Sequence, residues 1–156
     1  MDKFIGFFRT VSYLLFMAAL LWSYAYMVGQ ITYRFDSSGD PMYDIEKNTY
    51  FFSAVAIFIF ANAVCAVFIQ TLRKIKTSEE GVGLRNRSLK LDLISWTKGF
   101  AGVLNLFFAL VMFFLGLMNL AESKQSMTLG FYVYLGPILI VSWFFYLAYL
   151  LGKRRA

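Results

Sequence analysis

The side chains best suited to binding a metal ion lie in a polar stretch between residues 30 and 48. Asp36, Asp40 and Asp44 recur there at intervals of four, and clustered carboxylate oxygens are ligands that Ca²⁺ prefers. An EF-hand loop beginning at Asp36 would need glycine and glutamate where this chain has Pro41 and Lys47. The EF-hand is excluded, and two interpretations stay open: a looser divalent-ion site, or a tight turn of the kind that aspartate, glycine and proline favour.

Catalytic chemistry has few other residues available to it. The chain contains no histidine, which excludes imidazole-ligated haem, histidine-containing zinc sites and Ser-His or Cys-His catalysis by this chain. Its single cysteine, Cys65, lies inside an apolar segment, where we expect a small core residue. Asp92 and the three aspartates named above form no recognised acid–base arrangement. We therefore expect no enzymatic activity, no catalytic residue and no cofactor, and we assign no metal ligand.

Polar side chains within the apolar segments form the second group of candidates. Asn62 and Asn105 each lie in a long apolar run. Their amides suit either a ligand contact or an interhelical hydrogen bond, which is worth about 0.6 to 2 kcal/mol in a membrane. The hydrogen bond is the simpler interpretation, because any two packed helices provide it.

Small and polar residues around Asn105 recur at spacings of three and four, which places them on one face of a helix. Such a face lets another helix approach closely. Packing within the chain is the simplest interpretation, while a second copy, another subunit and a ligand stay open. Together with Asn62, this candidate packing or ligand face comprises Gly102, Asn105, Ala109, Met112, Gly116 and Asn119.

Four long apolar segments position these residues. Hydrophobic residues make up 60% of the 156 residues and charged residues 15%, well below the roughly 25% charged residues of soluble domains. Each segment approaches the length of about 20 residues that crosses a bilayer as a helix. We predict an all-α integral membrane protein, a single bundle of four transmembrane helices at residues 11–28, 50–72, 99–120 and 131–151. The predicted spans contain no Asp, Glu, Lys or Arg in their interiors, which argues against a proton-coupled transporter.

The connections between these spans differ in length. We predict an outer loop at residues 30–48 and a cytoplasmic loop at residues 73–98. Apolar residues mix with lysine and aspartate over residues 88–97, which favours a short amphipathic helix on the membrane surface. Gly136 followed by Pro137 predicts a bend in the fourth helix, because proline removes a backbone donor and clashes with the preceding turn.

The distribution of Lys and Arg predicts the orientation. Only Arg34, Lys47 and Lys124 of the fifteen lie in the connections after the first and third spans. Basic residues favour the cytoplasmic side of a membrane, so we expect both termini in the cytoplasm and a multi-pass protein of the plasma (inner) membrane. The remaining basic residues, on the cytoplasmic side, are Lys3, Arg9, Arg73, Lys74, Lys76, Arg85, Arg87, Lys90, Lys98, Lys153, Arg154 and Arg155.

The outer loop carries a family resemblance. It reads aromatic, acid, two small residues, glycine, acid and proline, and it closes with lysine. In this pattern, the stretch from Ile31 to Lys47 resembles the N-terminal membrane region of SdpI-type proteins. The resemblance implies a toxin-immunity or signal-transducing membrane protein. Thr32 and Arg34 stand where that family has a proline and a histidine. The matching positions are Phe35, Asp36, Gly39, Asp40, Pro41 and Lys47.

Two functions fit these observations. The first is a non-enzymatic membrane protein, an accessory subunit or an immunity or signalling factor, that contacts another membrane protein or a second copy through its helices. The alternative is a binder or carrier of small hydrophobic or lipidic molecules, with Asn62 and Asn105 as polar anchors in an apolar pocket. The net charge of +6 suits contact with the lipid bilayer better than contact with nucleic acid, because basic residues beside membrane spans set orientation.

Overall fold

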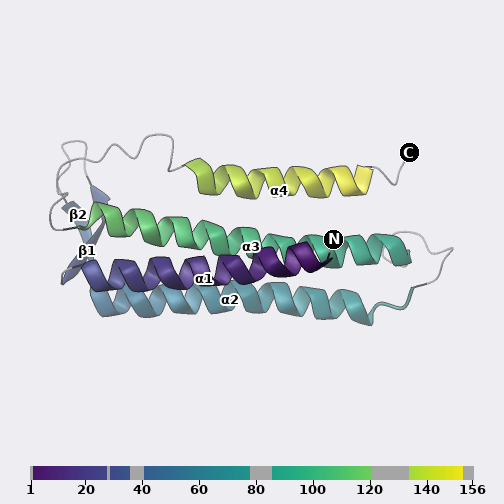
Figure 1. The fold of residues 1–156 in the computed structure, drawn as a ribbon, viewed down its shortest axis with the longest axis horizontal. Helices are drawn as coiled ribbons and strands as arrows, with labels where there is room; N and C mark the ends of the chain where they lie inside the picture. The colour runs from purple at the N-terminus through teal and green to yellow at the C-terminus, as the bar shows by residue number, and fades with distance from the viewer. Residues whose placement is uncertain (1, 28, 36–40, 78–85, 121–133, 153–156) are drawn as a thin grey trace.

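The computed structural model describes residues 2–27, 29–35, 41–77, 86–120 and 134–152. Four helices run along the long axis of the molecule, and two short strands lie between the first and second helices (Figure 1). Each helix is long and apolar enough to cross a membrane. Their bounds are α1 (Asp2–Tyr26), β1 (Gln30–Phe35), β2 (Pro41–Glu46), α2 (Lys47–Lys74), α3 (Arg87–Met118) and α4 (Leu135–Gly152).

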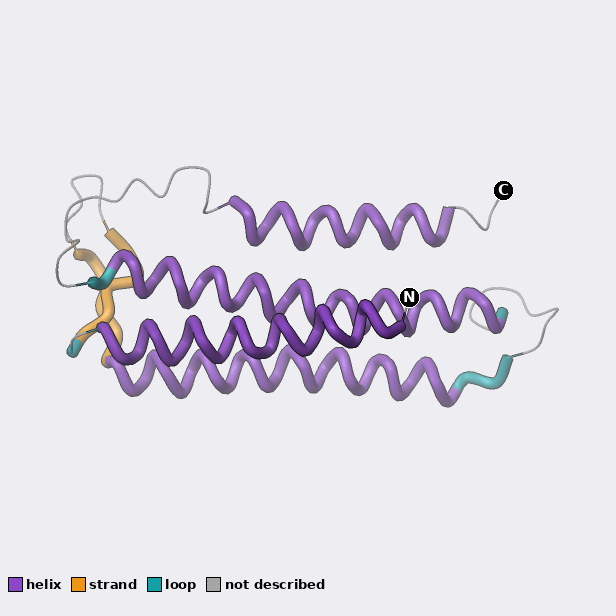
Figure 2. The backbone as a smooth tube through the Cα atoms, in the orientation of Figure 1, coloured by secondary structure: helices purple, strands orange, loops and turns teal. Residues whose placement is uncertain are grey.

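The two strands form an antiparallel hairpin at one end of the bundle (Figure 2). Gln30 pairs with Glu46 and Ile31 with Ile45, and the register becomes irregular beyond Thr32. The sequence predicted only a loop at residues 30–48, so the hairpin is an addition to the four-helix bundle, whose all-α class is confirmed. We call this end of the bundle the hairpin end, and the opposite end, where α2 finishes and α3 begins, the far end.

Helix α1 begins nine residues before its predicted span, at Asp2 rather than residue 11. The segment between Lys3 and Arg9 is mostly apolar, with Phe4, Ile5, Phe7 and Phe8. The apolar surface of the helix therefore starts before the uninterrupted apolar run at Val11. The span-length segment runs from Lys3 to Tyr26 and therefore includes Arg9. Arg9 lies outside the predicted span at residues 11–28, so the expectation that the span interiors lack charged residues stays a prediction.

Helix α3 is continuous over 32 residues, about 48 Å at 1.5 Å per residue. Its first turns include residues 88–97, so the predicted interfacial helix is the start of α3 rather than a separate element. Asn86 caps it by accepting hydrogen bonds from the backbone N–H groups of Ser88 (3.0 Å) and Leu89 (3.1 Å). A cap of this kind satisfies amides that have no partner within the helix, which explains why the helix starts there.

Gly136 and Pro137 lie in the first turn of α4, which begins at Leu135. Proline is tolerated in a first turn, since the backbone donor it lacks has no partner within the helix. The predicted bend in the fourth helix is therefore wrong, and the glycine–proline pair marks the start of α4 instead.

The core lies between α1, α2 and α3, and α3 occupies the centre. The most closely packed pair is α1 with α3, whereas α4 packs on α3. Cys65 is buried, as expected for a small core residue. At the far end, Lys90 of α3 donates to the carbonyl oxygens of Arg73 (3.0 Å) and Ile75 (2.8 Å), which ties the end of α2 to α3. The main core cluster consists of Phe16, Leu20, Met27, Ile31, Tyr50, Ala54, Ala109 and Met112.

Candidate functional site

The small and polar face of α3 lies mainly against α1. A Cβ atom built at Gly102 would lie 2.7 Å from the Phe8 ring, and one at Gly116 would lie 2.6 Å from the Trp22 ring and 3.0 Å from the Cβ of Ser23. Contacts this short are impossible for a real side chain unless the neighbour moves. The two glycines therefore set how closely α1 and α3 approach, and the sequence did not identify α1 as that partner.

Asn62 and Asn105 meet in the centre of the bundle. Asn62 donates from its amide nitrogen to the Oδ1 atom of Asn105 (2.7 Å) and to the carbonyl oxygen of Phe58 (2.9 Å). Asn105 is fully buried and in turn donates to the Oγ atom of Ser12 (3.4 Å). The two predicted amides thus join α1, α2 and α3 through hydrogen bonds.

This polar network continues to a charged residue that the sequence did not single out. Tyr13 donates its hydroxyl proton to the Oδ1 atom of Asn62 (2.8 Å), and the Arg9 guanidinium donates to the Tyr13 oxygen (2.8 and 3.2 Å). Ser12 closes the network by donating to the carbonyl oxygen of Arg9 (2.7 Å). The spacing of four between Arg9 and Tyr13 signals such a pair on a helix, and the early start of α1 concealed it.

A second polar contact joins the same helices nearer the hairpin end. Tyr50 of α2 lies 3.3 Å from the Oγ atom of Ser23 and donates to the sulfur of Met112 (2.9 Å). Ser23 itself donates to the carbonyl oxygen of Leu20 (2.9 Å). In the part of the chain that the structure describes, every buried side-chain nitrogen and oxygen has a hydrogen-bond partner. The buried polar groups of the bundle are therefore satisfied by contacts within the protein.

Asn119, at the end of α3, attaches the hairpin to the bundle. Its side chain accepts from the backbone N–H of Thr32 (2.8 Å) and donates to the carbonyl oxygen of the same residue (2.9 Å). This is the pattern of bonds that a neighbouring strand would make, so the amide pairs with β1 as if it extended the sheet. Ile31, the residue before Thr32, is buried in the core.

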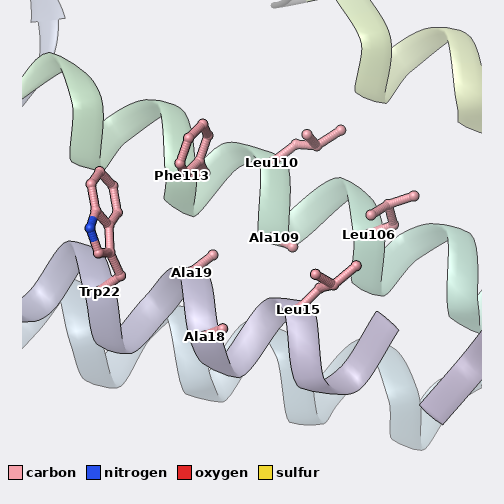
Figure 3. Close-up of a pocket in the computed structure, with 8 residues that line it drawn as sticks. All are labelled: Leu15, Ala18, Ala19, Trp22, Leu106, Ala109, Leu110 and Phe113. Atoms are coloured by element: carbon pink, nitrogen blue, oxygen red, sulfur yellow. The ribbon is translucent and has the colours of Figure 1, made fainter. Parts of the chain in front are cut away.

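An apolar groove of about 540 Å³ runs along the contact between α1 and α3. Figure 3 shows its side chains projecting from these two helices, with α2 behind them. Trp22 and Phe113 pack together at its hairpin end, with ring centroids 5.3 Å apart. The groove is lined by Leu15, Ala18, Ala19, Trp22, Leu106, Ala109, Leu110 and Phe113, so Asn62 and Asn105 do not line it.

Helix α4 is attached to α3 at two glycines. A Cβ atom at Gly99 would overlap the Trp143 ring, and one at Gly136 would lie 2.5 Å from the Phe107 ring. The Trp143 indole donates to the carbonyl oxygen of Trp96 (3.2 Å), and the Trp96 indole donates to the carbonyl oxygen of Trp143 (3.1 Å). These contacts fix both the distance of α4 from α3 and its rotation about its own axis.

The outer-loop positions are described only in part. Phe35 ends β1, Pro41 begins β2 and Lys47 begins α2; the Lys47 ammonium lies 4.5 Å from the centre of the Tyr24 ring. The other three positions of the pattern, Asp36, Gly39 and Asp40, lie outside the described residues.

A metal site is therefore tested only in the described part of the chain. There, no three His, Cys, Asp or Glu side chains come close enough to share an ion. Asp44 accepts a hydrogen bond from the Thr32 hydroxyl (2.6 Å). The other two aspartates of the divalent-ion hypothesis, Asp36 and Asp40, lie outside the described residues.

Comparison with known proteins gives no relative from which a role could be transferred. No family model, curated protein or solved structure matches this chain. Its function has to be argued from its own geometry.

Proposed function

We propose that this chain is a non-enzymatic multi-pass membrane protein that binds a transmembrane helix of another membrane protein through α4. The observation that carries this proposal is the position of α4, which is fixed against α3 along one edge only. Four of its exposed side chains recur at spacings of three and four and so form a single face, which we call the α4 outer face. It consists of Ile138, Val141, Phe145 and Tyr149.

The chemistry of this face suits a helix as its partner. Phe145 is 72% exposed and Tyr149 62% exposed, and aromatic residues are enriched in the centres of protein interfaces. The contacts of Trp143 with Trp96 and Gly99 hold α4 in one rotation, so the face is presented in a fixed direction. A helix packed in this way loses little further freedom when a second helix binds, which favours association in lipid.

The interior of the bundle supports the non-enzymatic part of the proposal. The buried polar groups of α1, α2 and α3 are used in hydrogen bonds among these helices. A catalytic site needs polar groups turned toward a substrate, whereas these groups are turned toward each other. The same observation disfavours the ligand-binding alternative in the form that used Asn62 and Asn105 as anchors.

The orientation and the family resemblance enter as parts of the same proposal. Basic residues at the far end, including Arg73, Lys74 and Lys90, support a cytoplasmic far end and an external hairpin in the plasma (inner) membrane. The resemblance of the outer loop to SdpI-type proteins supports an immunity or signalling role for the complex. In that role the partner's transmembrane helix would be the target that the protein protects or controls.

Site-specific photo-crosslinking tests the proposed partner. The crosslinking residue p-benzoylphenylalanine replaces Phe145 on the α4 outer face, and Phe60, an equally exposed phenylalanine of α2, serves as the matched control (72% and 70% exposed). In native membranes we expect position 145, and not position 60, to give one discrete adduct containing a peptide from a transmembrane helix of another protein. The adduct should weaken when Val141 is changed to tryptophan. Adducts with lipid alone at both positions, or with a second copy of this chain, would overturn the proposal.

Cysteine labelling tests the orientation separately. Cysteines introduced by Tyr33→Cys in β1 and Lys76→Cys after α2, each in a Cys65→Ala background, are both at exposed positions. In intact cells a membrane-impermeant maleimide should label position 33 and should reach position 76 only after lysis. The reverse pattern would place the hairpin in the cytoplasm.

A further inference from the structure

The apolar groove between α1 and α3 is short and ends against two packed rings at the hairpin end. At the hairpin end the Trp22 and Phe113 rings pack together, with their centroids 5.3 Å apart. Beyond the groove toward the far end, the Phe8 ring lies over Gly102 and joins the two helices. Its long side is open, and α2 lies behind the lining side chains in the view of Figure 3.

The position of the groove along the helices places it deep in an apolar medium. Leu106 and Phe113 at its two ends are seven residues apart on α3, which corresponds to about 10 Å. Phe113 is five residues from Met118, where α3 ends, or about 8 Å of helix. If a hydrocarbon core of about 30 Å begins near Met118, the groove runs from about 8 Å to about 18 Å into it.

Water and a transmembrane helix are poor occupants of this groove. All eight lining residues are apolar, and an apolar cavity offers water no hydrogen bonds. The groove holds about 540 Å³ along about 10 Å of helix, which is short compared with the roughly 20 residues of a transmembrane helix. The packed Trp22 and Phe113 rings also interrupt the apolar face at the hairpin end.

We propose that this groove is a binding site for one acyl chain of a membrane phospholipid. A flexible hydrocarbon chain is narrow enough to enter from the open side and needs no polar partner. Three alanines, Ala18, Ala19 and Ala109, create the space, because larger side chains there would fill the groove from its floor. In this site the acyl chain would contact Leu15 and Leu106 at one end of the groove and the Trp22 and Phe113 rings at the other. This site is on a different face from the α4 outer face, so it does not depend on the partner proposed above.

Native mass spectrometry with dioleoylphosphatidylcholine as the probe tests the site. Purified protein is freed of bulk lipid in detergent, and the lipid is then added back at increasing concentrations. We expect one lipid to bind the wild-type chain at low concentration and at least about tenfold weaker binding to the groove-filling variant Ala18→Leu/Ala109→Leu, a loss of about 1.4 kcal/mol. The matched control is Ala63→Leu, which enlarges an exposed alanine of α2 and should bind like the wild type. Equal binding by all three proteins would overturn the proposal.

A second measurement avoids the risk that the filled variant misfolds. One equivalent of a phosphatidylcholine with brominated acyl chains is added to wild-type protein and to Trp22→Phe, because bromine quenches the fluorescence of an adjacent indole. The wild type should lose emission that the Trp22→Phe variant does not lose. The same fractional quenching of both proteins would show that the bound chain does not lie against Trp22, and the site would be withdrawn.

Discussion

Trp96 and Trp143 donate their indole N–H groups to each other's backbone carbonyl oxygens, at 3.1 and 3.2 Å. The exchange is symmetrical across the contact of α3 with α4, and it needs both helices to hold one rotation. The Trp96 ring also packs against Phe144, with centroids 6.0 Å apart. Helix α4 is largely exposed, and these contacts hold it in a defined orientation against α3.

Trp143→Phe should loosen α4 while keeping an aromatic ring at the position. The change removes one indole hydrogen bond and part of the ring that covers Gly99, so we expect a loss of about 1 kcal/mol in unfolding free energy. Hydrogen exchange measured by mass spectrometry should become faster in α4 and stay unchanged in α1. Equal acceleration in both helices would mean that the contact stabilises the whole bundle.

Leucine at Gly102 or Gly116 should push α1 away from α3. Overpacking a core costs about 1 to 3 kcal/mol, and here the added atoms meet rings at 2.7 and 2.6 Å. The matched control is Gly6→Leu in α1, where an added Cβ has no atom within 4 Å and the cost should stay within about 0.5 kcal/mol. Unfolding in mixed micelles measures all three. If the three variants were equally stable, α1 and α3 would not be as close as described.

Asn62 and Asn105 should be energetically coupled. Replacing either with leucine removes the hydrogen bond between them, so the double variant Asn62→Leu/Asn105→Leu should lose less stability than the sum of the two single variants. We expect a coupling of about 0.6 to 1.7 kcal/mol, measured by a double-mutant cycle of unfolding free energies. Gln70→Leu, at an exposed amide of α2, is the control for amide loss and should show no coupling with Asn105→Leu. Strict additivity for Asn62 and Asn105 would contradict the network.

Asn119→Ala should release the hairpin from the end of α3. The alanine cannot make the two hydrogen bonds with Thr32, so we expect the amides of β1 to exchange at least about fivefold faster, equivalent to about 1 kcal/mol. Asn48→Ala is the control, because that exposed side chain bonds only to another side chain, the Tyr24 hydroxyl (3.1 Å), among the contacts described. Unchanged exchange in β1 would show that strand pairing alone holds the hairpin.

The helices could be predicted from the sequence because a run of about 20 apolar residues favours one local structure, a helix long enough to span a bilayer. The four apolar runs correspond to four helices that are long enough to span a bilayer. Spacings of three and four predicted the helix face that contains Gly102 and Asn105. The bounds were less accurate where apolar and charged residues mix, as before Val11 and over residues 88–97, since a helix continues through such segments when its other face is packed.

Pairings between distant residues could not be predicted in the same way. Nothing local to Trp96 indicates Trp143, and nothing local to Asn119 indicates Thr32, because each pair forms only when whole helices are placed. Arg9 is a related case, because it lies just before the uninterrupted apolar run that begins at Val11, and its partner Tyr13 is one of many aromatic residues in the chain.

The closed set of hydrogen bonds among α1, α2 and α3 has a consequence for synthesis at the ribosome. Arg9, Tyr13, Ser12, Asn62 and Asn105 all precede α4 in the chain, so these three helices can complete their polar contacts while the fourth is still being translated. Helix α4 can then pack on three helices whose polar contacts are already made.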